Sequence, residues 1–334
     1  MKKLALITLI LVLACVGAAA WWINDLSRYA ESPEDPSAAP RLIVIPPGMA
    51  FRDLVALLQQ NGIVRHPLRF RWLARRRGAD KKIQAGEYLL TGADPPRQIL
   101  ETLAGGNVYL HRLTVPEGYS LAQIAEVVAA AGLGDRAAFL QAAADRTLLR
   151  KLKIEAETLE GYLYPDTYLF PREATPEAII TVMVRRLRSV FTPEWQRRAQ
   201  ALGLSVHEVL TLASIIEKET GLSEERPLIS SVFHNRLQRG MRIQSDPTVI
   251  YGIADFDGNL TRRHLATPTP YNTYRIKGLP PGPIASPGAE AIRAALFPAE
   301  TGYLFFVSRR NKSHHFSTTL AEHNQAVRKY QLGQ

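Results

Sequence analysis

Hydrophobic residues fill the start of the chain without interruption, from Leu4 to Ile23, and no charged residue breaks the run. At a rise of about 1.5 Å per residue, a helix of this length reaches roughly 30 Å, the thickness of the hydrocarbon core of a bilayer. Two lysines precede the run and an acidic segment follows it, which places the N-terminus inside and the rest of the chain outside. The pattern predicts a cytoplasmic tip at 1–3 and a transmembrane anchor at 4–23.

Two processed forms of this segment stay open. The alanines at 18–20 resemble a signal-peptidase site, which predicts a secreted protein, and the residues before Cys15 loosely match a lipoprotein cleavage site. Residues 16–23 stay apolar, which favours a retained span because processed segments usually turn polar soon after the cut. All three forms export the remainder of the chain.

A polar, proline-rich segment at 24–40 follows the span. Such a composition is typical of a linker, so we expect a stalk that lifts the first domain off the membrane. No motif lies before Arg41. We therefore expect a chain without residues 1–40 to fold and to keep its activity.

An internal repeat comes next. Residues 44–62 and 114–132 each contain a short apolar strand, a Pro-x-Gly turn and an apolar residue pattern of helical spacing that ends near a glycine. We expect two tandem α/β modules, at 41–110 and 111–200. Each resembles LysM, a small strand–helix–helix–strand fold that binds glycans, and the alternative is a purely structural module without a ligand.

The pattern changes to capped helices in 201–334. A capping box at Ser205 predicts a helix that ends at Thr220, further helices are expected from Glu224 and Asp246, and the Pro- and Gly-rich stretch 267–287 predicts irregular structure. The expected fold class is α+β. It comprises an N-terminal transmembrane helix, two small LysM-like α/β modules and a mixed, mainly helical catalytic domain.

Composition narrows the choice of partner. The chain carries 41 basic and 31 acidic side chains, a formal charge of +10, which suits an anionic partner. Export argues against nucleic acid and leaves an acidic wall polymer or the membrane surface. Cys15 is the one cysteine and lies in the apolar run, and His314 and His315 have no acidic cluster beside them, so no metal or other cofactor is expected.

The C-terminal end of the helix predicted after Ser205 carries the candidate chemistry. Leu210, Ala213 and Glu217 are spaced three and four residues apart and so share one face. A carboxyl group on an apolar stripe loses hydration, which raises its pKa, as a general acid for sugar cleavage requires. Glu219 points about 200° away, so the two carboxylates do not form an adjacent pair. The alternative is that both face water in a frayed last turn.

Several long motifs, in order, resemble those of the endolytic murein transglycosylases, the YceG-like family. They lie at 160–168, 212–220, 231–237, 241–252, 267–274 and 278–288. The resemblance covers nearly everything after the predicted stalk. It implies a lyase that cuts nascent peptidoglycan strands between N-acetylmuramic acid and N-acetylglucosamine, and it places the family's catalytic glutamate at Glu217.

The reaction so implied requires one carboxyl group. Glu217 first protonates the leaving oxygen and then takes the proton of the muramic acid's own 6-hydroxyl, which leaves a 1,6-anhydro end. Polar and aromatic residues in the neighbouring motifs are the substrate-binding candidates: Gln244, Ser245, Asp246, Tyr271, Asn272, Tyr274 and Asn235. Their alternative roles are local caps, turns and core packing.

Two other functions stay open. One is a non-catalytic scaffold that binds peptidoglycan, and the other is a muramidase with two carboxylates, in which Glu160 or Asp246 faces Glu217. The expected location is the inner membrane, with a single pass and a periplasmic catalytic domain. The expected partners are peptidoglycan strands, the membrane and, from the family's role near glycan polymerisation, peptidoglycan synthases or the elongation machinery.

Overall fold

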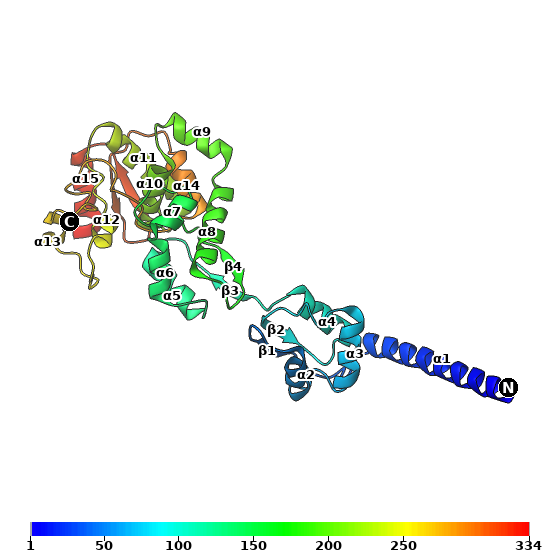
Figure 1. Cartoon of the computed structure of the whole chain (residues 1–334). Helices are drawn as coiled ribbons and strands as arrows, with labels where there is room; N and C mark the ends of the chain where they lie inside the picture. The colour runs from blue at the N-terminus through cyan, green and yellow to red at the C-terminus, as the bar shows by residue number, and fades with distance from the viewer. Residues whose placement is uncertain (1, 334) are drawn as a thin grey trace. The chain divides into compact units, whose positions relative to one another are not determined.

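The computed structural model describes residues 2–333, with side chains from residue 5 (Figure 1). Met1, the first residue of the predicted cytoplasmic tip, lies outside the described residues. The chain divides into two compact units. Unit 1 comprises the chain up to His111 together with 171–173, and unit 2 comprises 112–170 and the chain from Ala174 onward.

Helix α1 (Lys2–Glu31) begins as an exposed apolar helix and ends inside the core of unit 1. The part from Ala5 to Glu31 is long and apolar enough to cross a membrane. Its last turns bury Leu26, Tyr29 and Ala30. These residues are three and four positions apart and therefore share one face of the helix.

The segment predicted as a stalk, 24–40, is not a free linker. Beyond α1, the Glu34 carboxylate accepts the backbone N–H groups of Arg65 at 2.6 Å and His66 at 2.9 Å. The backbone of Asp35 donates to Gly92 at 2.9 Å. The polar composition that is typical of a linker here satisfies backbone groups at the start of a neighbouring helix, so the prediction of a stalk is corrected.

Unit 1 is built on the antiparallel pair β1 (Arg41–Ile45) and β2 (Gly86–Leu90). Helices α2 (Phe51–Gln60) and α3 (Pro67–Arg77) connect the strands, and α4 (Pro96–Gly105) follows. The inward side chains alternate along the strands and pack on the apolar faces of the helices. The order strand–helix–helix–strand is the one predicted, and the likeness to LysM stays a prediction.

Near the start of unit 2 lies a second strand pair, β3 (His111–Thr114), whose first residue belongs to unit 1, and β4 (Thr167–Phe170). Its helices and remaining strands are α5 (Leu121–Ala130), α6 (Arg136–Ala143), α7 (Arg146–Lys151), α8 (Pro176–Val190), α9 (Pro193–Ala201), α10 (Val206–Glu219), the 3₁₀ turn η1 (Ser223–Glu225), α11 (Arg226–Gln238), α12 (Asp246–Tyr251), α13 (Arg262–Ala266), α14 (Ala289–Leu296), the antiparallel pair β5 (Phe305–Ser308) and β6 (His314–Ser317), α15 (Leu320–Val327) and the π-helical turn η2 (Arg328–Leu332). The stretch 267–287 is irregular, as predicted.

Helix α10 is the centre of unit 2. It begins at the predicted capping box of Ser205 and Glu208, and every residue from Val209 to Ile216 is buried. It packs against α11, α12 and α14. One hydrophobic core runs from Leu113 to Leu296. The boundary expected between 200 and 201 therefore does not separate two cores, because a sequence repeat marks a local motif and not the limits of packing.

Candidate active site

Two glutamates at the end of α10 lie in different surroundings. Glu217 Oε1 accepts from Arg226 Nη2 at 3.1 Å, and its Oε2 accepts from the backbone N–H of Gly288 at 3.0 Å. Gly288 is the N-cap residue of α14, where a negative charge is favourable. The Glu217 and Arg226 side chains are only 7% and 10% exposed. Glu217 is thus a buried, ion-paired cap between α10, α11 and α14.

Glu219 lines a pocket of about 450 Å³. The Ser245 hydroxyl donates to its Oε1, and within residues 2–333 no basic side chain forms an ion pair with it. Burial raises the pKa of Glu219 to about 7; the Asp246 charge adds to the rise, whereas the Ser245 hydrogen bond and the Arg236 charge oppose it. Glu219 is therefore a carboxyl group that holds its proton close to neutral pH.

Arg236 of α11 fixes one wall of the Glu219 pocket. Its guanidinium donates to the backbone carbonyls of Leu304 at 2.6 Å and Ile243 at 2.7 Å, and to Gln244 Oε1 at 3.3 Å. Gln244 has φ of +55°, the left-handed region that is uncommon outside glycine. Such conformations persist where the surroundings determine them, and they gather at functional sites.

The irregular stretch 267–287 holds Ser245 and the start of α12 in place through Thr273. Its hydroxyl accepts the backbone N–H of Ser245 at 3.0 Å and bonds the Thr248 hydroxyl at 2.8 Å. Tyr274, the next residue, donates its hydroxyl to Asp246 Oδ1 at 2.7 Å. The start of α12 is therefore held in place by two residues of a segment that has no regular structure.

Three of the predicted substrate-binding residues line the Glu219 pocket: Gln244, Asp246 and Tyr274. Ser245 is buried and does not line it, but its hydroxyl donates to Glu219. The other predicted residues lie elsewhere. The Asn235 amide donates to the backbone carbonyls at 301 and 303, both at 2.9 Å. The Asn272 amide donates to carbonyls in the stretch 264–267. Because each amide is occupied by backbone oxygens of its own unit, both asparagines tie loops together.

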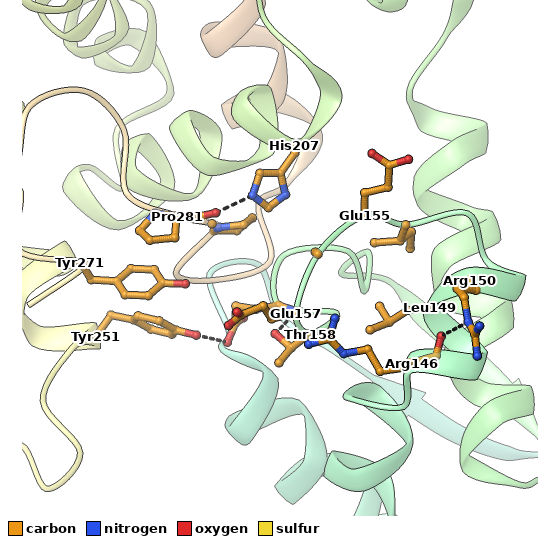
Figure 2. Close-up of a pocket in the computed structure, with 15 residues that line it drawn as sticks. Arg146, Leu149, Arg150, Glu155, Glu157, Thr158, His207, Tyr251, Tyr271 and Pro281 are labelled. Atoms are coloured by element: carbon orange, nitrogen blue, oxygen red, sulfur yellow. Dashed lines mark hydrogen bonds between the residues drawn. The ribbon is translucent and has the colours of Figure 1, made fainter.

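Tyr271 lines a second and larger cavity, of about 1000 Å³ (Figure 2). Figure 2 shows Tyr251 and Tyr271 reaching into it from one side and Arg146 from another. The Tyr251 and Tyr271 ring centroids are 4.8 Å apart. His207 closes the top by bonding the Pro281 carbonyl through Nε2 at 2.7 Å. This cavity therefore combines an aromatic wall with polar groups of both signs.

Glu160 is the buried carboxyl group of this second cavity. It accepts the backbone N–H of Leu121 at 3.0 Å and the Tyr251 hydroxyl at 3.2 Å, and burial raises its pKa to about 7. Asp246 lies in the Glu219 pocket instead. Glu160 and Asp246 were the acids expected to face Glu217 in a two-carboxylate muramidase. Neither is hydrogen-bonded to Arg226 or Gly288, the two residues that bond Glu217.

The periodicity argument that selected Glu217 applies equally to Glu219. Leu212, Ile215 and Ile216 precede Glu219 by seven, four and three positions, so all four share one face of α10. Because α10 is buried on all sides, helical spacing alone does not choose between the two glutamates. Arg236 lines the pocket and Thr273 holds Ser245. Both lie inside the family motifs, but no pattern along the sequence indicates these roles, since the contacts are made with other segments.

The predicted histidine pair is divided between two environments. His314 Nδ1 lies 2.7 Å from Glu225 Oε2, whereas His315 Nδ1 lies 3.4 Å from Arg309. No group of three or more His, Cys, Asp or Glu residues in the described part of the chain is arranged to hold a metal ion.

Comparison with known proteins decides the family. The sequence profile of the YceG-like family matches residues 43–329. The chain belongs to the YceG-like family. A Bacillus subtilis relative, named endolytic murein transglycosylase, is 34% identical over 304 residues, which cover 86% of this chain and 84% of the relative. A Streptococcus pneumoniae protein of the same name is 32% identical over 79% of this chain, but the match covers only 53% of that longer protein.

A solved structure agrees with this family assignment. The crystal structure of a YceG-like protein from Listeria monocytogenes is similar with a TM-score of 0.60 and 32% sequence identity. The match covers 87% of this chain and 100% of the Listeria chain. The fold described above is therefore a YceG-like fold.

Proposed function

We propose that this YceG-like protein is an endolytic peptidoglycan lytic transglycosylase. It cuts the bond between N-acetylmuramic acid and N-acetylglucosamine within nascent strands and leaves 1,6-anhydromuramic ends. The names of the relatives support the reaction class. The observation that carries the proposal is Glu219, a carboxyl group with a pKa of about 7 in a pocket lined by polar groups that suit a sugar.

Glu219 is the general acid of this proposal, and Glu217 is the alternative. A general acid must hold its proton until the leaving oxygen takes it, so a pKa near the working pH is required. Glu219 meets this condition and lines a pocket. Both oxygens of Glu217 already accept hydrogen bonds from protein groups. The assignment to Glu217 from the family resemblance stays a prediction, which the same experiment tests.

The proposed reaction has two proton transfers. The Glu219 carboxylic proton passes to the glycosidic oxygen while the bond from that oxygen to the anomeric carbon breaks. The resulting carboxylate then takes the proton of the 6-hydroxyl, whose oxygen bonds the anomeric carbon. Asp246 supplies negative charge beside the sugar ring as positive charge develops there. Gln244 and Tyr274 orient the sugar, and the buried Ser245 positions Glu219.

A second candidate function rests on the place of Asp246. A hydrolytic muramidase usually has two carboxyl groups in its active site, and the second one activates water or attacks the sugar. Asp246 lines the same pocket as Glu219. The products separate the two functions, since a lyase leaves anhydromuramic ends and a hydrolase leaves reducing ends. A scaffold leaves the strands intact.

The experiment digests purified glycan strands with the wild-type protein and with Glu219→Gln and Glu217→Gln, and it analyses the ends by mass spectrometry. Glutamine keeps the size of glutamate but has no carboxylic proton. We expect Glu219→Gln to lower the rate about 10²- to 10⁴-fold. Glu217→Gln, the matched control two residues away, keeps far more activity per folded molecule. If Glu217→Gln loses more activity than Glu219→Gln, the acid is Glu217. Wild-type activity in both variants excludes both glutamates as the acid, and strands left intact by the wild-type protein favour the scaffold.

The Tyr271 cavity is proposed to hold a further part of the strand. Aromatic faces and hydroxyl groups suit a sugar or its peptide, and Tyr271 and Tyr274 link this cavity to the Glu219 pocket along one short segment. Tyr271→Ala should raise KM several-fold with a smaller change in kcat. If Tyr271→Ala instead lowers kcat several-fold and leaves KM unchanged, a binding role for Tyr271 is contradicted. The strand–helix–helix–strand module of unit 1 is proposed as a LysM-like contact to the same polymer.

The enzyme is proposed to be anchored in the inner membrane by α1, with its N-terminus in the cytoplasm and both units in the periplasm. The apolar stretch of α1 supports the anchor. The charge distribution around it supports the orientation. N-terminal sequencing of the mature protein is the test, and a start at Cys15 or Trp21 contradicts the anchor. Peptidoglycan synthases or the elongation machinery are the proposed protein partners.

A further inference from the structure

Helix α3 presents apolar residues on each of two faces. Phe70, Leu73 and Ala74 are buried in the core of unit 1. Leu68 and Trp72 face outward, with 70% and 55% of their surface exposed. They are four residues apart and so form one stripe, which Arg75 and Arg76 continue. Large apolar side chains exposed in this way mark a contact surface.

The outward stripe of α3 borders a crevice of about 460 Å³ against α1. Its walls are Trp22, Ile23 and Leu26 of α1 and Trp72, Arg75 and Arg76 of α3. An ion pair between Arg69 and Asp25 at 3.3 Å joins the two helices beside it. The crevice thus combines an apolar wall with two guanidinium groups.

Positive charge is concentrated around this crevice. The segment 65–82 carries eight lysines and arginines and one acidic residue, Asp80. Several of the arginines are already paired, among them Arg77 with Glu101 at 3.2 Å. Arg75 and Arg76 are exposed and make no ion pair with any residue that the structure describes. Two neighbouring guanidinium groups are therefore free for an anion from outside the chain.

The position of the crevice along α1 fixes its depth relative to a bilayer. The apolar run ends at Ile23, and Leu26 is already buried in unit 1. Three residues of helix rise about 4.5 Å. The headgroup layer on each side of a bilayer is about 5–7 Å thick. If α1 spans the membrane, the Trp72 side of α3 lies at the headgroup layer, where tryptophan and arginine are favoured.

We propose that the crevice between α1 and α3 binds the phosphate headgroup of an anionic phospholipid from the outer leaflet of the membrane that α1 spans. Arg75 and Arg76 contact the phosphate, and Trp22, Ile23 and Trp72 contact the glycerol and the upper acyl chain. Guanidinium groups suit phosphate oxygens, and basic pockets beside transmembrane helices bind acidic headgroups. This site seats unit 1 on the membrane surface. It is independent of the chemistry proposed for unit 2.

The test titrates the full-length protein, in micelles of a neutral detergent, with phosphatidylglycerol and counts bound lipid by native mass spectrometry. At about 1 kcal/mol for each arginine, Arg75→Gln with Arg76→Gln should weaken binding about 30-fold. Trp72→Ala should weaken it as well. The matched control is Arg262→Gln with Arg263→Gln, which removes the same charge from two adjacent exposed arginines of unit 2.

We expect weaker binding of phosphatidylglycerol only in the α3 variants. The wild type should bind phosphatidylcholine much more weakly than phosphatidylglycerol. Three results overturn the proposal: equal affinity for phosphatidylcholine, unchanged binding in the Arg75/Arg76 variant, and an equal loss in the Arg262/Arg263 control. Inorganic phosphate is added as a competitor. Displacement of the lipid by millimolar phosphate assigns the site to a free anion and also overturns the proposal.

Discussion

Glu219 holds a proton near neutral pH because its surroundings withhold water from its charge, and this has a consequence for stability. In the unfolded chain the carboxyl group titrates near 4.5, whereas in the folded chain its pKa is about 7. Between these values the folded state binds more protons, so this group makes the protein less stable as pH rises from about 4.5 to about 7. Well above pH 7 this carboxyl group causes no further loss of stability.

Glu219→Gln should therefore stabilise the protein at pH 8 and do so much less at pH 5. The gain at pH 8 is at most about 3 kcal/mol, the free energy of the pKa shift, because glutamine avoids burying a charge. Urea denaturation of wild type and variant at the two pH values measures the difference. A variant that is less stable than wild type at pH 8 contradicts the environment described for Glu219.

Glu217→Gln is the matched comparison, and it should lower the stability of the folded protein instead of raising it. It leaves the buried Arg226 without its carboxylate, and removing one partner of a buried pair is destabilising by about 3 kcal/mol. The same denaturation series measures it. Equal effects of the two substitutions on stability would show that the two glutamates do not differ in the way that their contacts indicate.

The pH dependence of cleavage tests the neighbours of Glu219. Because the acid must be protonated, kcat/KM should fall above about pH 7, the pKa of Glu219. The Ser245 hydrogen bond lowers that pKa and the Asp246 charge raises it. Ser245→Ala should move the alkaline limb to higher pH, and Asp246→Asn should move it to lower pH. Shifts in the same direction, or no shift in either, contradict Glu219 as the acid.

The sequence revealed the residue types of the site but not their grouping. Gln244, Asp246 and Tyr274 were found from polar runs inside the family motifs, and the structure brings them together in one pocket, with Ser245 bonded to Glu219. The choice between Glu217 and Glu219 depends on which one meets Arg226 and which one meets Ser245. Those contacts are made across elements, so no periodicity along α10 contains them.

At the scale of elements, irregular backbone positions the start of α12. Thr273 accepts the Ser245 N–H and bonds Thr248, and all three residues are almost fully buried. Thr273→Val keeps the shape and removes the hydroxyl. A buried N–H left without a partner costs about 1–3 kcal/mol, so we expect a loss of stability of that size.

The same substitution should lower kcat, because Ser245 also donates to Glu219. Thermal unfolding and strand cleavage measure the two effects. The control is Thr267→Val, which removes a hydroxyl that bonds only the Arg263 carbonyl on an exposed turn. Similar losses of activity in the two variants contradict a specific role for Thr273.

The sequence predicted helices better than it predicted connections. The capping box at Ser205 marked the start of α10, and 267–287 was expected to be irregular. The segment 24–40 was predicted as a linker because prolines and acidic residues are typical of one. Glu34 instead bonds backbone groups of the two residues before α3, and the backbone of Asp35 bonds the turn after β2; these contacts depend on the packed fold.

At the scale of the whole molecule, the residues that the structure describes form two hydrophobic cores in place of the three domains that were expected. The second repeat, 111–200, contributes Leu113, Ile124 and Phe139 to the same core as α10. The first repeat keeps its own core, which includes the end of α1. Repeats of similar sequence therefore pack differently, because the second copy shares its core with α10 and the first shares its core with the end of α1.

This division revises where the chain can be truncated. Residues 1–40 were expected to be dispensable, but Leu26, Tyr29 and Ala30 belong to the core of unit 1. A chain that begins at residue 24 keeps these residues and should fold completely. A chain that begins at residue 41 loses two large buried side chains, each worth about 1.5–3 kcal/mol of burial, so unit 1 should be markedly less stable.

Unit 2 contains none of residues 1–40 and holds the whole Glu219 pocket. Both truncated chains should therefore cut soluble strands, although the shorter one has a destabilised unit 1. Calorimetry resolves the prediction, because two units with separate cores can unfold in separate transitions. Only the transition of unit 1 should move to lower temperature in the chain that begins at residue 41. Identical melting of the two chains contradicts the packing of α1 on unit 1, and loss of cleavage in the shorter chain means that unit 1 takes part in catalysis.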